Sequence, residues 1–175
     1  MRQAQLRHVI LEIGERFGLT EFYVIGSAAI LASLPDPPEG SLVATRDVDV
    51  IPGADDEKVA DQISYVMGEA SEFDLTYGYY AQGVTLSTPK YAPRGWQSRT
   101  IPIQVDRYRA LCMEPHDLLL SKLGAGREKD LEFARAAVLS VSVQRDELLA
   151  RLADVAADPA VRRLIEDRIR ALFGK

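Results

Sequence analysis

The first eighteen residues carry a clear helical pattern of apolar positions. These positions recur at intervals of three and four residues, which places them on one face of a helix: Leu6, Val9, Ile10, Ile13 and Phe17. A glycine follows at position 18, and helices commonly end at glycine. The pattern predicts an amphipathic helix that ends near residue 18.

Two short segments carry the pattern of strands. Residues 21–25 (EFYVI) are aromatic and β-branched, which favours a short buried strand. Residues 47–51 (DVDVI) alternate charged and apolar side chains, so a strand there would carry both aspartates on one face. Between them we expect a small-residue helix over residues 27–34, stopped by the proline- and glycine-rich loop 35–40.

Beyond residue 51 helical and strand patterns continue to residue 113, and the pattern is helical from Pro115 onward. Apolar spacing predicts a helix over residues 55–69, and the tyrosines, glycines and prolines of residues 72–100 are interpreted as a strand followed by a long, partly ordered loop. Residues 100–105 and 110–113 are expected to be strands. Four helices should follow Pro115, the last with Asp158 as its cap and Pro159 as its first residue.

These elements predict one domain over residues 1–175, of the α+β (mixed α/β) class. Residues 20–113 would form a mixed sheet flanked by helices, and residues 114–175 a helical C-terminal part. We expect the apolar faces of the last two helices to pack on their own domain. The arginines of the last helix would face solvent, with contact to RNA or a partner as the alternative: Arg162, Arg163, Arg168 and Arg170.

Composition narrows the class of protein. The 175 residues are 47% apolar and 27% charged with a formal net charge of −5, which excludes a disordered chain and a basic protein that coats nucleic acid. The single cysteine, Cys112, excludes an internal disulfide and fits a reducing compartment. The apolar stretch 22–34 is too short to span a bilayer and the N-terminus lacks a signal-peptide core, so we expect a cytoplasmic protein without membrane contact.

Three polar groups are candidates for chemistry. Gly26-Ser27 follows a strand, where a close backbone approach and free N–H groups can bind phosphate, although such turns are often only turns. Asp47 and Asp49 would repel each other without a cation, which indicates a divalent metal or, alternatively, a solvated strand face. Residues 121–130 (SKLGAGREKD) place Lys122 after an apolar run, either facing a phosphate chain or lying in an ordinary polar turn.

Together these residues resemble the nucleotidyltransferase superfamily. Its signature is a Gly-Ser turn followed by Asp-x-Asp, here within residues 45–49 (TRDVD). Residues 114–133 (EPHDLLLSKLGAGREKDLEF) and 76–84 (TYGYYAQGV) look like one bacterial branch, related to the abortive-infection toxins of toxin–antitoxin systems. The resemblance covers roughly residues 20–140.

The resemblance implies a role for each candidate residue. Asp47 and Asp49 would hold Mg²⁺, and Gly26-Ser27 would lie against the phosphates of an NTP. By similarity to the toxin branch, Lys122 would bind phosphate and Asp130 would complete the polar site. The superfamily usually has a third carboxylate on a later strand, for which Asp106, after the expected strand 101–105, is the candidate.

Two departures from the superfamily pattern stand out. Nineteen residues separate Ser27 from Asp47, so the proline-rich loop is an insertion that could cover or reshape the site. The third carboxylate is weakly marked. In addition, Tyr79, Tyr80 and Gln82 either bind a base or pack down a loop, and His116 is expected to be a structural group at a helix start.

Two functions remain open at this point. The first is a Mg²⁺-dependent enzyme that moves an NMP from an NTP onto a hydroxyl of RNA, protein or a small molecule, as a toxin of a toxin–antitoxin system. The second is a non-catalytic protein that uses the same fold to bind its partner in a toxin–antitoxin pair. The first would need NTP, Mg²⁺ and an acceptor, and both allow an antitoxin partner.

Overall fold

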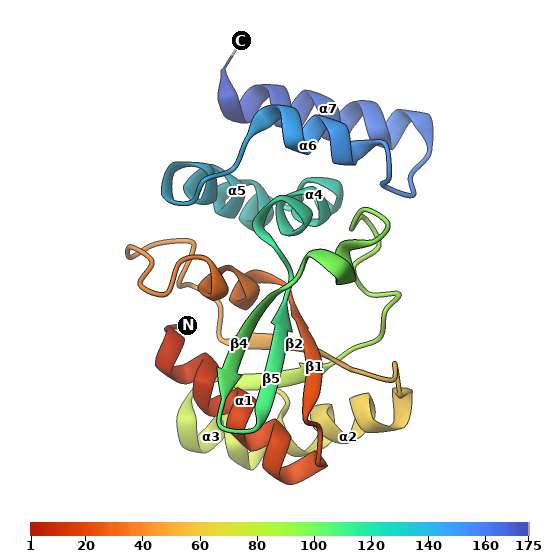
Figure 1. The fold of residues 1–175 in the computed structure, drawn as a ribbon. Helices are drawn as coiled ribbons and strands as arrows, with labels where there is room; N and C mark the ends of the chain where they lie inside the picture. The colour runs from red at the N-terminus through yellow and green to blue at the C-terminus, as the bar shows by residue number, and fades with distance from the viewer. Residues whose placement is uncertain (175) are drawn as a thin grey trace.

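The computed structural model describes residues 1–174 (Figure 1). The helices and strands follow in the order α1 (Gln3–Phe17), β1 (Glu21–Ile25), the 3₁₀ helix η1 (Ser27–Ala32), β2 (Asp47–Pro52), α2 (Glu57–Met67), α3 (Glu72–Tyr77), β3 (Tyr80–Gly83), the 3₁₀ helix η2 (Trp96–Arg99), β4 (Ile101–Val105), β5 (Tyr108–Cys112), α4 (Pro115–Ala125), α5 (Glu128–Ser140), α6 (Arg145–Leu152) and α7 (Pro159–Phe173).

The five strands form one mixed sheet in the order β3-β2-β1-β5-β4. Strand β1 runs antiparallel to β2 and parallel to β5, while β3 runs parallel to β2. Because of this, the end of β1 and the beginning of β2 lie at the same edge of the sheet, with Ile25 opposite Asp49. The predicted α+β class and the mixed sheet flanked by helices are confirmed.

The helices separate into two groups. Helices α1, α2 and α3 lie alongside the sheet, whereas α4–α7 stack beyond the ends of β1 and β5 (Figure 1). One cluster of buried apolar side chains runs through both groups, from Leu6 in α1 to Ile169 in α7. No helix within residues 1–174 is both long and apolar enough to cross a bilayer.

The small-residue helix expected after Gly26 is present as the 3₁₀ helix Ser27–Ala32. One segment differs from the sequence-based expectation. Residues 72–100 were expected to begin with a strand, but they begin with helix α3, and the strand β3 follows at Tyr80–Gly83. The signals for this helix were its caps: the Ser71 hydroxyl accepts the Asp74 N–H, and Gly78 adopts a left-handed conformation at its end.

The C-terminal helices pack on their own domain, with Ile165 and Ile169 of α7 fully buried. Two arginines of this helix do not simply face solvent. Arg162 donates to the carbonyls of Ala153 and Val155, at 3.0 and 2.9 Å, and Arg168 donates to a carbonyl of α4. Half of the expected basic face therefore fixes α7 to its neighbours.

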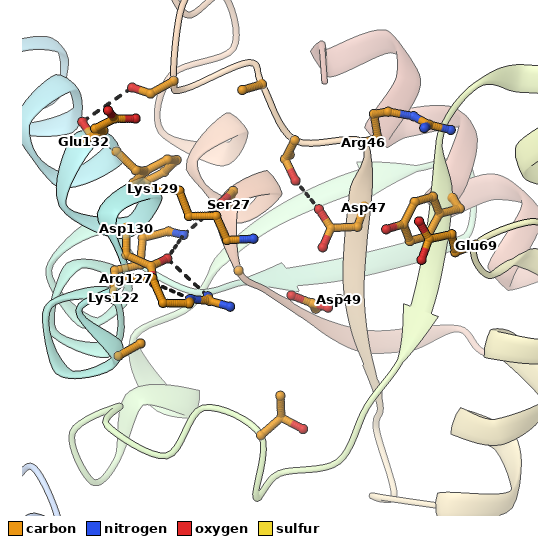
Figure 2. Close-up of a pocket in the computed structure, with 18 residues that line it drawn as sticks. Ser27, Arg46, Asp47, Asp49, Glu69, Lys122, Arg127, Lys129, Asp130 and Glu132 are labelled. Carbon is orange, nitrogen blue, oxygen red and sulfur yellow. Dashed lines mark hydrogen bonds and ion pairs between the residues drawn. The ribbon is translucent and has the colours of Figure 1, made fainter.

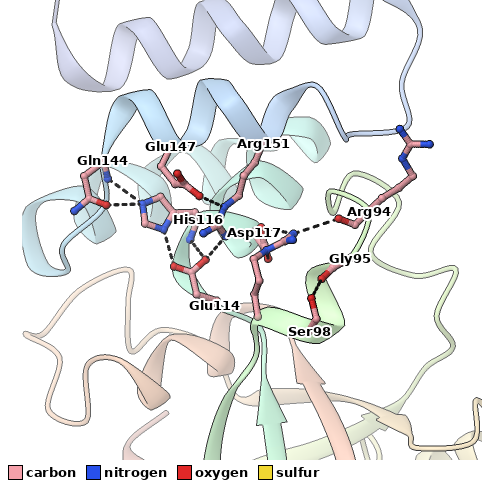
Figure 3. Close-up of polar contacts among 10 residues, drawn as sticks. Arg94, Gly95, Ser98, Glu114, His116, Asp117, Gln144, Glu147 and Arg151 are labelled. Atoms are coloured by element: carbon pink, nitrogen blue, oxygen red, sulfur yellow. Dashed lines mark hydrogen bonds and ion pairs between the residues drawn. The ribbon is translucent and has the colours of Figure 1, made fainter.

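A buried polar network joins α4 to α6 and η2 (Figure 3). The Asp117 side chain is fully buried and accepts from Arg99 at 2.8 Å and from Arg151 at 2.8 Å. Arg151 also donates to Glu114 at 2.6 Å. Three elements that are distant in sequence thus share one buried carboxylate.

His116 lies in the same network. The backbone N–H of Gln144 donates to its Nε2 at 3.0 Å, and its Nδ1 lies 2.6 Å from a carboxylate oxygen of Glu114 (Figure 3). The ring thereby supports the beginning of α6. His116 is a structural group at a helix start, as expected from the sequence.

The network generates a stability prediction. Asp117→Ala should lower the free energy of unfolding by about 3–5 kcal/mol, because two arginines would lose a buried partner. Chemical denaturation monitored by circular dichroism measures this loss. Asp167→Ala, at an exposed position of α7, is the control and should change stability by less than about 0.5 kcal/mol. Equal effects of the two substitutions would contradict a structural role for Asp117.

Candidate functional site

A pocket of about 880 Å³ opens where β1 ends and β2 begins (Figure 2). Residues from both halves of the chain line it: Gly26, Ser27, Ser41, Ala44, Thr45, Arg46, Asp47, Asp49, Glu69, Tyr80, Thr88, Lys122, Ala125, Arg127, Lys129, Asp130, Glu132 and Phe133. Six of the seven residues expected at the site are among them. The fold brings these six together across about a hundred residues of sequence.

Gly26 allows the backbone to approach the aspartates closely. Its φ of 70° lies in the left-handed region, and a Cβ at this position would collide with a carboxylate oxygen of Asp49. Ser27 begins the 3₁₀ helix, and its hydroxyl accepts a hydrogen bond from Lys122 at 2.9 Å. The left-handed φ therefore favours glycine at position 26, and a larger residue there would also displace the Asp49 carboxylate.

Asp47 and Asp49 line the pocket from the same face of β2, while Val48 and Val50 between and beyond them are buried. Burial, reinforced by the charge of Asp47, raises the pKa of Asp49 to about 6 from its usual 3.8. The Thr45 hydroxyl donates to Asp47. The ionised pair is thus unstable in the protein alone, and a cation between the carboxylates would relieve it.

Lys122 lies across the pocket from this pair, in a cluster of charges. Its ammonium is 3.3 Å from Asp130 and 4.4 Å from the ring centre of Phe133. Burial lowers the pKa of Lys122, and the Asp130 carboxylate opposes that effect. Arg127 closes the cluster with two hydrogen bonds to Asp130, at 2.6 and 3.2 Å.

Asp130 forms ion pairs with both Lys122 and Arg127. Burial alone would raise its pKa, but the hydrogen bonds and charges of Arg127 and Lys122 outweigh burial and hold it below its usual value. Asp130 therefore stays ionised and orients both cations. Lys122 and Arg127 are both held in place by this ionised carboxylate.

The segment between the proline-rich loop and β2 borders the pocket. Ser41, Ala44 and Thr45 contribute to its wall, and the Ser41 hydroxyl donates to the backbone carbonyl of Glu132 in α5 at 3.4 Å. Residues 35–40, the proline-rich loop itself, are not among the residues that line the pocket, so covering of the site by this loop stays a prediction. The bordering segment connects the beginning of β2 with the helical half of the chain.

The structure places the seventh candidate, Asp106, elsewhere. Asp106 lies in the tight turn between β4 and β5, where Val105 pairs with Tyr108. Its φ of 50° is that of a hairpin turn residue, and its carbonyl accepts from Gln104 at 2.7 Å. This turn is at the opposite end of the sheet from Gly26 (Figure 1), so Asp106 is not a third carboxylate of the pocket.

Sequence reasoning assigned no site role to five charged residues that line the pocket: Arg46, Glu69, Arg127, Lys129 and Glu132. Arg46 directly precedes the aspartates, and Glu69 follows α2 without any motif around it. Tyr80 lines the pocket, whereas Tyr79 is buried and bonds to His8, and Gln82 donates to Ser64. Of the three base-binding candidates, only Tyr80 reaches the site.

Asp47 and Asp49 fit a divalent cation that prefers oxygen ligands, such as Mg²⁺. Their charges have no ion-pair partner within residues 1–174. No three acidic, histidine or cysteine side chains of the described residues are grouped closely enough to hold a metal by themselves. The protein offers two carboxylates, so water and the phosphates of a substrate would supply the remaining ligands.

The sequence matches, over residues 4–171, the family described as a nucleotidyltransferase of unknown function (DUF6036). The chain belongs to this family. The match confirms the resemblance to the nucleotidyltransferase superfamily, while the toxin branch remains a prediction. Comparison with curated proteins and with solved structures gave no match.

The raised pKa of Asp49 leads to a prediction for this member of the family: the effect of Asp49→Asn on stability should depend on pH. Asp49→Asn should raise the free energy of unfolding by about 1–3 kcal/mol near pH 7.5 without metal, since one unit of pKa corresponds to roughly 1.4 kcal/mol. The folded-state pKa of Asp49 is raised from 3.8 to about 6. The wild type therefore loses stability as the pH rises from about 4 to about 6, and the variant does not.

Denaturation curves between pH 4 and 8 measure this difference. The difference in the free energy of unfolding between Asp49→Asn and the wild type should disappear near pH 4. Added Mg²⁺ should reduce this difference at pH 7.5, because the ion stabilises only the wild type. Asp61→Asn, at an exposed position of α2, is the control and should show no such difference. A difference that is constant with pH would contradict the electrostatic origin of the effect.

Proposed function

We propose that this family member is a Mg²⁺-dependent nucleotidyltransferase that moves an NMP from an NTP onto a hydroxyl group. The observation that supports this proposal best is that one pocket carries two acidic side chains on one side and two basic side chains on the other. Asp47 and Asp49 form one side, and Lys122 with Arg127 forms the other (Figure 2). An NTP that carries Mg²⁺ has the complementary charges for both sides.

The cationic side suits the phosphate chain of the nucleotide. Lys122 and Arg127 are held by Asp130, and Lys129 lines the same side of the pocket. Ser27 lies at 2.9 Å from the Lys122 ammonium, so a phosphate at this place would contact a hydroxyl and a cation together. These groups would bind the two outer phosphates and stabilise the charge of the departing pyrophosphate.

The acidic side orients the phosphorus that reacts. Asp47 and Asp49 would hold Mg²⁺, which neutralises charge on the phosphate oxygens and lowers the pKa of the attacking hydroxyl when bound. Gly26 leaves room beside Asp49 that a larger residue would fill. The pocket walls, including the insertion at Ser41, would limit the access of water to the reacting atoms.

Transfer of a labelled nucleotide tests this proposal. The protein would be incubated with each α-labelled NTP and Mg²⁺, together with total RNA, with cell protein, or with a small-molecule extract. Label should appear in one fraction as pyrophosphate is released. Asp49→Asn should reduce transfer at least about 100-fold, the scale of losing one preorganised electrostatic contact.

Asp106→Asn is the matched control, because Asp106 lies outside the pocket and should leave transfer unchanged. A wild type that binds Mg²⁺ and NTP but labels no fraction would favour the non-catalytic alternative, a binding partner in a toxin–antitoxin pair. The toxin role has its own readout. Expression of the wild type, and not of Asp49→Asn, would then arrest the growth of a bacterial host.

A further inference from the structure

The basic side chains of the pocket lie on one side of the two aspartates, and this asymmetry decides from which side an acceptor hydroxyl can attack. Lys122, Arg127 and Lys129 lie on one side of Asp47 and Asp49 (Figure 2). In phosphoryl-type transfer the attacking and leaving oxygens are roughly in line through the phosphorus. If the pyrophosphate leaves toward the cations, the acceptor hydroxyl attacks from the opposite side.

The opposite side holds Arg46 and Glu69 (Figure 2), and Tyr80 lies beside Arg46. On strand β3, Tyr80 pairs with Asp47 and Gln82 pairs with Asp49. The sheet therefore places no third carboxylate beside the aspartates. Gln82 is turned away, with its amide donating to Ser64 at 2.8 Å.

Glu69 supplies a carboxylate to this side from outside the sheet. It lies in the short connection between α2 and α3, between Gly68 and Ala70. Ala70 has a φ of 63°, a left-handed conformation that is uncommon for alanine and tends to occur at functional sites. A Cβ on Gly68 would collide with the Ser64 carbonyl, so both neighbours of Glu69 have restricted conformations.

Further contacts fix this connection to the site. The buried Asp74 accepts the N–H of Ala70 at 3.1 Å and also pairs with Arg46, the residue before Asp47. Arg46 in turn donates to the Gly78 carbonyl at 2.9 Å and lies 6.0 Å from the ring centre of Tyr80. The backbone at Glu69 is thereby tied to the beginning of the strand that carries the aspartates.

Glu69 is exposed at the border of the pocket, and its carboxylate has no bonded partner among the described residues. Within residues 1–174 it forms no ion pair or side-chain hydrogen bond, whereas Asp130 in the same pocket is bound by two cations. Its charge reaches Tyr80, where burial, Asp47 and Glu69 together raise the pKa of the phenol. Glu69 also forms no three-residue metal-binding group with the aspartates, among the residues described. A carboxylate that holds no cation of the protein is free to receive a proton.

We propose that Glu69 is the general base that receives the proton of the acceptor hydroxyl. The inference rests on the proposed function. The acceptor oxygen forms a bond to the α-phosphorus of the NTP while the bond between that phosphorus and the bridging oxygen breaks. Pyrophosphate leaves with the electron pair toward Lys122 and Arg127, and the hydroxyl proton passes to the Glu69 carboxylate.

Glu69→Gln tests the proposal, because glutamine keeps the size of the side chain and cannot accept the proton. It should lower kcat for transfer about 10²–10⁴-fold, the usual contribution of a general base. Affinity for an NTP with a methylene bridge between its α- and β-phosphates should stay within about twofold by calorimetry. The kcat defect should shrink as the pH rises, since more of the acceptor hydroxyl is then already ionised.

Mn²⁺ binding provides a readout that does not depend on activity. Calorimetric affinity for Mn²⁺ should be unchanged in Glu69→Gln and reduced in Asp49→Asn. Glu72→Gln is the matched control: Glu72 is exposed three residues further on, outside the pocket, and its substitution should change none of these quantities. Thermal unfolding checks that both variants are folded.

Three results would overturn the role of Glu69. They are an unchanged kcat in Glu69→Gln, an equal loss in Glu72→Gln, or a loss of Mn²⁺ affinity in Glu69→Gln, which would make Glu69 a metal ligand. A wild type that transfers nothing to any acceptor and releases no pyrophosphate would overturn the proposed function and this inference with it. An active wild type with an equally active Glu69→Gln would overturn only the inference.

Discussion

The repulsion between Asp47 and Asp49 is the constraint on which the rest of the site depends. Two carboxylates on one face of a strand lie in a pocket where burial already opposes their ionisation, and the pKa of Asp49 rises to about 6 as a result. The nearest cations reduce this conflict only in part. The charges of Lys122 and Arg127 lower the pKa of Asp49, but burial and the charge of Asp47 outweigh them, and both cations are bound to Asp130. The incompletely compensated pair is what makes this part of the pocket suitable for a divalent cation.

The cationic side owes its position to the packing of α4. Lys122 is buried near Phe133, and its ammonium is directed between Ser27 and Asp130. The same helix begins in the network around Asp117, where arginines from η2 and α6 meet one buried carboxylate. The C-terminal helices thus have a role in the site although they contribute no side chain beyond α5 to the pocket. They hold the helix that carries the lysine.

Much of this arrangement could be predicted from the sequence. The periodicity of residues 6–17, the alternation in residues 47–51 and the Asp158-Pro159 start of the last helix each depend on neighbours within one turn or one strand, and the structure has all three elements. Errors arose where local patterns were ambiguous. Residues 72–100 were expected to begin with a strand, while the deciding signals for helix α3 at their start were the caps at Ser71 and Gly78.

The sequence by itself determined the types of residue at the site, because Gly-Ser, Asp-x-Asp and the lysine segment are local motifs. Which residues share the pocket was decided by strand order and by the direction of each strand. Asp106 follows a strand, as a third carboxylate might have been expected to, but β4 runs antiparallel to β5 and carries it to the far end of the sheet. Glu69 has no motif, and a strained turn fixed by Asp74 brings it to the pocket. Proximity of this kind depends on contacts between residues distant in sequence, which no local pattern contains.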